Sequence, residues 1–223
     1  MDRVDLFPLY NSLRISAIAT VLAFTLGILA AYAVLKMPRI LKGICDTVLT
    51  IPMVLPPTVV GYFILVYLSP KSAVGGWLYK WFSAMITMRW QGSVIAVTVI
   101  AFPFVYRTVR GAFEAFDQNL LDAGRTLGLS EWYIFGRILL PNCKQGILAG
   151  TVLAFARGLG EYGATSMVSG YIAGKTATIS TSVAYFWQIN QEDAAFWWVM
   201  VNLAVSFVFM ILINIFSKPK VRG

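Results

Sequence analysis

The segment ISAIATVLAFTLGILAAYAVL, residues 15–35, decides the class of protein to which this chain belongs. It contains 21 uncharged residues between Arg14 and Lys36. A helix that crosses a bilayer needs about 20 mostly apolar residues, so the segment predicts a transmembrane helix. A cleaved signal peptide has an apolar core of only about 7–15 residues. We therefore expect this helix to be retained.

The composition of the whole chain agrees with that prediction. Of its 223 residues, 58% are hydrophobic and 13% are charged, against about 45–50% and 25% in soluble domains. The chain has no histidine, and its two cysteines, Cys45 and Cys143, lie far apart. These facts exclude histidine-based catalysis, histidine metal sites and a disulfide scaffold. We expect an integral membrane protein with no metal site, no catalytic residue and no cofactor of its own.

Five low-charge intervals account for the apolar residues. The sequence predicts an all-α integral membrane protein, one domain over residues 1–223, with spans at about 13–35, 47–69, 90–110, 146–169 and 194–217. If the N-terminus lies outside, inner segments carry eleven Lys and Arg residues and outer segments carry six. The positive-inside rule therefore favours N-out, C-in. We assign the net charge of +8 to contacts with anionic lipid and expect no nucleic-acid partner.

The second interval is interrupted by prolines. It contains Pro52, Pro56, Pro57 and Gly61. Proline removes helical hydrogen bonds and kinks a membrane helix where protein or a water-filled cavity rescues the freed carbonyls. Three prolines within six residues favour a helix beside a conduit, and a purely structural kink is the alternative.

The fourth interval carries a charged pair. Arg157 and Glu161 are four residues apart, which places them on one face of a helix. An uncompensated charge at the bilayer centre costs at least about 2.5–3.5 kcal/mol. The pair either fixes helix packing or borders a polar path, and the neighbouring Gly158, Gly160 and Gly163 would let the backbone bend there.

Two glycine-rich stretches resemble nucleotide-binding motifs. Residues 158–163, GLGEYG, match G-x-G-x-x-G but lie in a membrane span without a preceding strand, so close helix packing explains them better. Residues 170–176, GYIAGKT, resemble a P-loop that is one residue short, on the outer face where ATP is absent. We therefore expect another polypeptide to supply any nucleotide site.

The inner loop, residues 111–143, has an amphipathic helical pattern. Gly128 predicts the end of one short helix, and Ser130 predicts the N-cap of the next. A plain solvated linker is the alternative, but a helix pair with an exposed apolar face usually docks onto a partner.

The same loop carries a family resemblance. It contains, in order, Asp122-Ala123-Gly124, three residues, Gly128, nine residues and the sequence ILLP at residues 138–141. This arrangement resembles the "EAA" loop of bacterial ABC importer permeases. That pattern is E-A-A, three residues, G, nine residues and I-x-L-P. The departures are Asp122 for Glu and Gly124 for the second Ala. The resemblance implies a type I ABC importer permease fold, with this loop as a cytoplasmic coupling helix that docks on the ATP-binding subunit through Asp122, Ala123, Gly124, Arg125, Gly128, Ile138 and Pro141.

Three further stretches narrow the family. They are residues 49–62, LTIPMVLPPTVVGY, residues 123–128, AGRTLG, and residues 153–165, LAFARGLGEYGAT. All three resemble segments of molybdate permeases, and sulfate permeases share much of the pattern. The resemblance implies the permease subunit of an ATP-driven importer that carries molybdate by alternating access, with tungstate or sulfate/thiosulfate as the alternative. A membrane enzyme or an ATP-independent channel is a more remote alternative.

The resemblance also implies an assembly and a location. Two copies of the chain would form the pore, with two ATP-binding subunits that hold ATP and Mg, and an extracytoplasmic oxyanion-binding protein. The location would be the plasma (inner) membrane of a bacterium or archaeon. The resemblance, the prolines and the charged pair together predict a pathway or gate at Pro56, Pro57, Thr58, Gly61, Arg157, Gly160, Glu161 and Gly163.

Overall fold

The computed structural model describes residues 5–82 and 86–216. Its elements, in chain order, are α1 (Phe7–Leu35), α2 (Arg39–Val54), α3 (Pro57–Leu68), α4 (Ala73–Phe82), α5 (Trp90–Glu114), α6 (Gln118–Thr126), α7 (Glu131–Tyr133), the π-helix η1 (Ile134–Leu139), α8 (Leu140–Asn142), α9 (Lys144–Leu159), α10 (Gly163–Val168), α11 (Ile179–Gln188) and α12 (Glu192–Phe216). Within the described residues no strand is present, so the predicted all-α class is confirmed.

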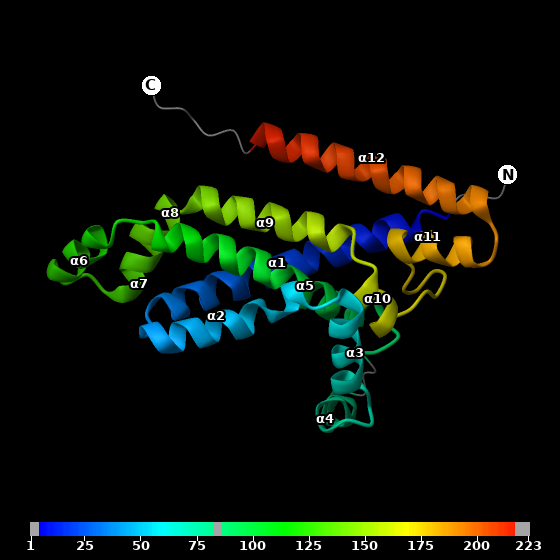
Figure 1. Ribbon diagram of the computed structural model, residues 1–223, viewed down its shortest axis with the longest axis horizontal. Coiled ribbons are helices and arrows are strands. Elements are labelled where there is room, and N and C mark those ends of the chain that lie inside the picture. The colour runs from blue at the N-terminus through cyan, green and yellow to red at the C-terminus, as the bar shows by residue number, and fades with distance from the viewer. Residues whose placement is uncertain (1–4, 83–85, 217–223) are drawn as a thin grey trace.

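Helices α1, α5 and α9 form the central bundle and lie side by side (Figure 1). Their contacts depend on small residues, as is usual for membrane helices that pack closely. Ala19, Ala23 and Ala31 of α1 are fully buried. A Cβ added at Gly27 would lie 2.8 Å from a methyl carbon of Val105. This bundle is the rigid frame on which the remaining elements are placed.

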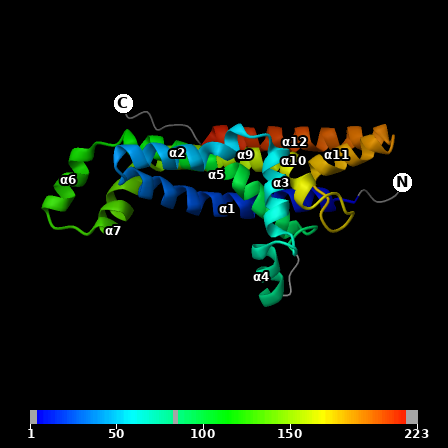
Figure 2. The ribbon, with the colours of Figure 1, turned by 60° about the horizontal axis from the view of Figure 1, so that its bottom comes forward.

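The two ends of the bundle differ. The segment α6–α8 covers one end, while α11 and the start of α1 lie at the other (Figures 1 and 2). Helices α3 and α4 project sideways from the bundle as an arm. Helix α12 runs along the outside and packs mainly on α11, with a ring contact between Phe155 of α9 and Phe209 of α12.

Three of the described helices are long and apolar enough to cross a bilayer by themselves: α1, α5 and α12 over Glu192–Ile211. Two pairs of helices, each bent at a short break, would raise the number to five. These pairs are α2 with α3, bent by 107°, and Glu131–Asn142 with Lys144–Leu159, bent by 74°. By length and composition, the described helices could therefore supply three to five spans. The second bent pair begins before the fourth predicted interval, 146–169, and shares only α9 with it.

The second predicted interval is not one kinked helix. Its helix begins earlier, at Arg39, and ends at Val54, after which the chain turns into α3. A residue before proline is pushed into extended backbone, and Leu55 and Pro56 have ψ values of 143° and 135°. Two successive prolines thus end α2 and start α3.

The fourth predicted interval is also interrupted. Helix α9 ends at Leu159, residues 160–162 are not helical, and the short helix α10 follows. The bend expected at these glycines is therefore a complete break. It places α10 against α3 rather than in line with α9.

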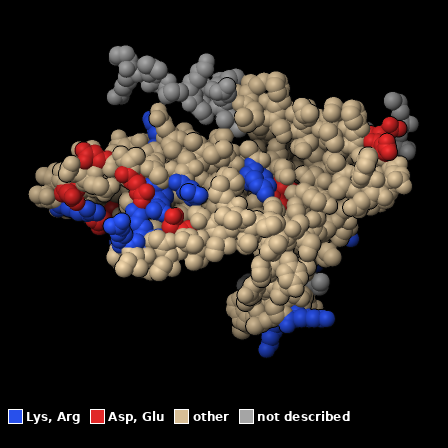
Figure 3. Space-filling model, in the orientation of Figure 1, with Lys and Arg blue, Asp and Glu red and all other residues tan. Residues whose placement is uncertain are grey.

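On the face of the molecule that Figure 3 shows, most charged side chains lie at one end. Figure 3 shows basic and acidic groups gathered over the α6–α7 end, and a mostly uncharged surface between that end and the opposite one. Large apolar side chains are exposed on α1 and α12, such as Val21, Leu26, Leu203 and Phe207. A surface of this kind is suited to lipid or to another apolar helix.

Candidate functional site

The turn at Gly128 joins α6 to α7 as the sequence predicted. Gly128 has a positive φ of 75°. Its N–H donates to the carbonyl of Arg125 at 2.9 Å, and the N–H of Leu129 donates to the carbonyl of Gly124 at 3.1 Å, which is the Schellman pattern of a glycine-terminated helix. The hydroxyl of Ser130 then accepts the Tyr133 N–H at 3.3 Å, so the predicted N-cap is confirmed.

A chain of charges fixes this turn to the membrane helices. Arg125 lies 2.6 Å from Asp122 and 2.7 Å from Glu131, and the other oxygen of Glu131 lies 2.7 Å from the Nζ of Lys36, directly after α1. Hydrogen bonds from Arg125 and then Lys36 lower the pKa of the Glu131 carboxyl to about 2. Asp122 and Arg125, which the sequence analysis assigned to docking, are therefore linked through Glu131 to the end of α1.

The apolar residues of the α6–η1 segment divide into two groups. Leu121, Ile134, Phe135 and Leu139 are buried in the core with α1 and α5. The side chains that remain exposed are Leu120, Leu127, Trp132 and Tyr133. These exposed side chains form an apolar surface that packing within this chain does not bury.

Glycine at position 124 fits a tight contact inside the segment. A Cβ added there would lie 3.3 Å from Ile134 and 3.4 Å from the tip of Ile138. Both neighbours are flexible side-chain ends, so alanine, which the family pattern has at this position, needs only a small shift. Ile138 is part of the π-helix, and Pro141 lies in the first turn of α8, where proline is tolerated.

The two proline and glycine regions of the predicted pathway are brought together. Gly61 of α3 faces α10 so closely that an added Cβ would lie 2.7 Å from the Cα of Ala164. From the other side, a Cβ on Gly163 would lie 3.0 Å from the Cβ of Pro57 and 3.1 Å from the amide nitrogen of Thr58. The contact between α3 and α10 therefore requires glycine at position 61 and leaves little room for a side chain at position 163.

Glu161 holds the break between α9 and α10. One of its carboxylate oxygens lies 2.5 Å from Arg157, in the last turn of α9. The other accepts the Ala164 N–H at 2.7 Å, at the start of α10. The residue is 3% exposed. The predicted i,i+4 pair is thus present, and its carboxylate also caps the next helix, which the sequence spacing did not indicate.

Gly160 has a looser environment than its neighbours. Nothing lies within 4 Å of an added Cβ, and its φ is −90°. The structure therefore gives no steric reason for glycine at this position.

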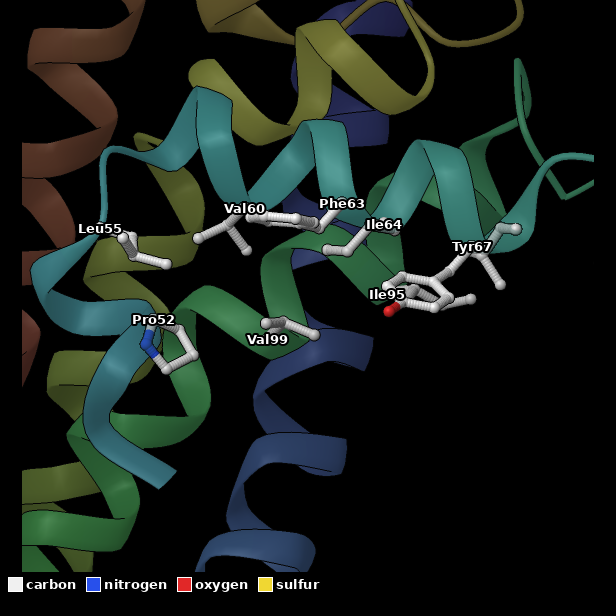
Figure 4. Close-up of a pocket in the computed structure, with 9 residues that line it drawn as sticks. Pro52, Leu55, Val60, Phe63, Ile64, Tyr67, Ile95 and Val99 are labelled. Atoms are coloured by element: carbon white, nitrogen blue, oxygen red, sulfur yellow. The ribbon is translucent and has the colours of Figure 1, made fainter. Parts of the chain in front are cut away.

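The cavity at the bend between α2 and α3 is apolar. Side chains of α3 point toward α5, and the end of α2 closes the other side (Figure 4). The lining residues are Pro52, Leu55, Val60, Phe63, Ile64, Tyr67, Leu68, Ile95 and Val99. Such a surface offers little to stabilise an oxyanion, so this cavity does not fit the polar path that the sequence predicts.

A second charge network joins α2 to α5, and sequence reasoning missed it. Arg110 pairs with Asp46 and, at 3.2 Å, with Glu114, while Lys42 also pairs with Glu114. The hydroxyl of Tyr106 donates to Asp46 at 3.1 Å. The i,i+4 spacing of Arg110 and Glu114 was the available signal, but no sequence pattern connects them to α2.

Comparison with known proteins identifies the fold and the family. Residues 23–222 match the family described as "Binding-protein-dependent transport system inner membrane component". The molybdenum transport system permease protein ModB of Escherichia coli K12 is 41% identical over 172 residues, 77% of this chain and 75% of that protein. The sulfate transport system permease protein CysT of the same organism is 31% identical over 199 residues, 88% of this chain and 71% of that protein.

Among solved structures, a bacterial ABC transporter that imports alginate has the same fold, with a TM-score of 0.78 at 16% identity over 100% of this chain and 82% of that one. The predicted type I ABC importer permease fold is thereby confirmed, and the chain belongs to the family of binding-protein-dependent transport system inner membrane components.

Proposed function

We propose that this chain is the permease subunit of an ATP-driven molybdate importer. The observation that carries the proposal is the 41% identity to a molybdenum permease over 77% of the chain. The geometry of the two helix breaks and of the α6–α8 segment is consistent with it. The chain itself carries no catalytic group in this proposal, because ATP and Mg are bound by a separate subunit.

The α6–α8 segment is the proposed docking element for the ATP-binding subunit. Its exposed apolar side chains, including Leu127 and Trp132, supply the contact, and Gly128 sets the angle between its two helices. Closure of the ATP-binding subunits would move this segment, and the Lys36–Glu131 pair would pass the movement to α1. Two-state rocking of this kind requires rigidly packed elements, which the bundle provides.

The proposed gate is the contact between α3 and α10. Gly61 and Gly163 keep this contact tight, and Glu161 ties it to α9. A conduit must bind its ion weakly enough to release it. The hydroxyls of Thr58 and Ser166 beside the break would suffice, with affinity residing mainly in the binding protein.

The proposed assembly contains two copies of the chain, two ATP-binding subunits and an extracytoplasmic oxyanion-binding protein. It lies in the inner membrane of a bacterium or archaeon, with the N-terminus outside and the α6–α8 segment in the cytoplasm. The cluster of Lys and Arg side chains at the α6–α8 end supports this orientation through the positive-inside rule.

Sulfate is the alternative substrate, favoured by the 31% identity to a sulfate permease over 88% of the chain. The deciding experiment measures ATPase activity of the purified assembly with its binding protein loaded with molybdate, tungstate or sulfate. The proposal predicts the largest stimulation with molybdate. Stimulation by sulfate alone would replace molybdate with the alternative, and no anion-dependent stimulation would refute the importer function.

A further inference from the structure

Three basic side chains from distant parts of the chain meet at one pocket, at the end of the bundle opposite α6–α8. Arg14 comes from α1, Arg89 directly precedes α5, and Lys175 comes from the loop before α11. The pocket has a volume of about 510 Å³, and Trp90, Gln91 and Thr176 are among its other lining residues. We call it the outer basic pocket, in keeping with the predicted topology.

The pocket is held by contacts between its parts. The guanidinium carbon of Arg14 lies 3.6 Å from the centroid of the Trp90 ring, a stacked cation–π geometry. The carbonyl of Arg89 accepts the hydroxyl of Ser169 at 2.8 Å, which joins the start of α5 to the end of α10. These contacts hold the Arg14 side chain on Trp90 and the backbone of Arg89 on the end of α10.

The loop that carries Lys175 is the stretch that resembles a P-loop. Its backbone N–H groups are used internally: those of Lys175, Thr176 and Ala177 all donate to the carbonyl of Ile172, and that of Ile172 donates to the Thr176 hydroxyl at 3.0 Å. These amides cannot cradle a phosphate as a P-loop does. What the loop offers an anion is the Lys175 side chain, on a folded support.

Among residues 5–82 and 86–216, no carboxylate balances the charges of this pocket. No described acidic residue lines it, and none of the ion pairs found in this part of the chain includes Arg14, Arg89 or Lys175. By contrast, Lys36, Lys42, Arg110 and Arg125 at the opposite end all have carboxylate partners. Clustered cations with indole and amide donors nearby form a surface that attracts an anion.

We propose that the outer basic pocket binds a tetrahedral oxyanion group. The group is either a free oxyanion on the outer side of the membrane or the phosphate of a lipid headgroup, since both present the same oxygen geometry to the three cations. In the free-anion form the proposal rests on the proposed function, with the pocket collecting the anion before it reaches the break between α9 and α10.

The test uses the complete assembly of permease and ATP-binding subunits in nanodiscs of phosphatidylcholine. Binding of radiolabelled molybdate, with inorganic phosphate as competitor, is measured without the binding protein. The variants are Arg89→Gln and Lys175→Gln, and the control is Lys80→Gln, an outer basic residue of α4 that does not line the pocket. In a second arm, nanodiscs contain phosphatidylglycerol or phosphatidic acid, and lipid retained through purification is quantified by mass spectrometry.

The proposal predicts that each pocket variant weakens oxyanion binding, or retention of anionic lipid, by on the order of ten-fold, while Lys80→Gln does neither. Loss in the first arm identifies a free anion, and loss in the second identifies a lipid headgroup. If wild type and the pocket variants are equal in both arms, the proposal is wrong. ATPase activity is measured on the same wild-type samples with the loaded binding protein. If the binding protein stimulates ATPase while the pocket variants bind like wild type, the pocket proposal fails and the proposed function stands.

Discussion

The Nζ of Lys36 lies 2.7 Å from a carboxylate oxygen of Glu131, so an ion pair joins the end of α1 to the start of α7. The same carboxylate accepts Arg125 from α6. One acidic side chain thus connects the first membrane helix to both helices of the proposed docking segment. The docking segment is therefore connected to the helix bundle by ion pairs through Glu131.

Acid should weaken that link over a defined pH range. The pKa of Glu131 falls from 4.5 to about 2 through its bonds to Arg125 and Lys36. A depressed carboxyl pKa stabilises the folded state above the unfolded pKa, and this contribution is lost as pH falls from about 4.5 toward 2. The thermal stabilities of wild type and Glu131→Gln should therefore differ near neutral pH, and the difference should shrink below about pH 4.5 and disappear only near pH 2. A difference that is independent of pH would contradict the ion-pair assignment.

The turn at Gly128 should be sensitive to any side chain, although space is open around it. Nothing lies within 4 Å of an added Cβ, but the φ of 75° costs an L-residue about 1–2 kcal/mol. We expect Gly128→Ala to reduce both co-purification with the ATP-binding subunit and uptake. Gly136→Ala is the control, because that helical position is equally open and has no positive φ. Equal losses in the two variants would show that the turn geometry does not matter.

The contact between α3 and α10 should fail when Gly61 gains a methyl group. A Cβ there would collide with the backbone of Ala164, and overpacking of this kind costs about 1–3 kcal/mol. Gly61→Ala should lower the melting temperature of the assembly and its uptake. Gly160→Ala should change stability by no more than about 0.5 kcal/mol, because nothing surrounds that position. Normal uptake by Gly61→Ala would remove this contact from the proposed gate.

Exchange of the charges at positions 157 and 161 should not restore function. Removing one member of a buried pair costs about 3 kcal/mol, so Arg157→Met and Glu161→Met should each destabilise the chain. An arginine at position 161 could pair with a glutamate at 157 but could not accept the Ala164 N–H, as Glu161 does at 2.7 Å. Glu161→Gln, which keeps an acceptor, should be milder than Glu161→Met. Full rescue by Arg157→Glu with Glu161→Arg would show that only the ion pair matters.

Local features of the sequence predicted local features of the structure well. The Gly128 turn and the Ser130 cap follow from backbone preferences of single residues, and both are present. The Arg157–Glu161 pair follows from helical spacing. Features of this kind need no knowledge of the rest of the fold.

Tertiary features escaped prediction because they depend on which segments meet. Hydropathy cannot distinguish a kinked span from two helices bent by 107°. Sequence periodicity does not predict contacts between separate segments. Examples are the approach of Gly61 to Ala164, the capping of α10 by Glu161 and the pairing of Arg110 with Asp46. Which apolar residues of α6–η1 are buried likewise depends on where α1 and α5 lie, and the sequence does not give their positions.

In the proposed mechanism, a separate ATPase drives the gate in this chain from the α6–α8 end. The decisive measurement is molybdate uptake into proteoliposomes that contain either the permease alone or the whole assembly with its binding protein, with and without ATP. We expect uptake only by the whole assembly with ATP. Uptake at full rate by the permease alone, with no nucleotide present, would contradict it.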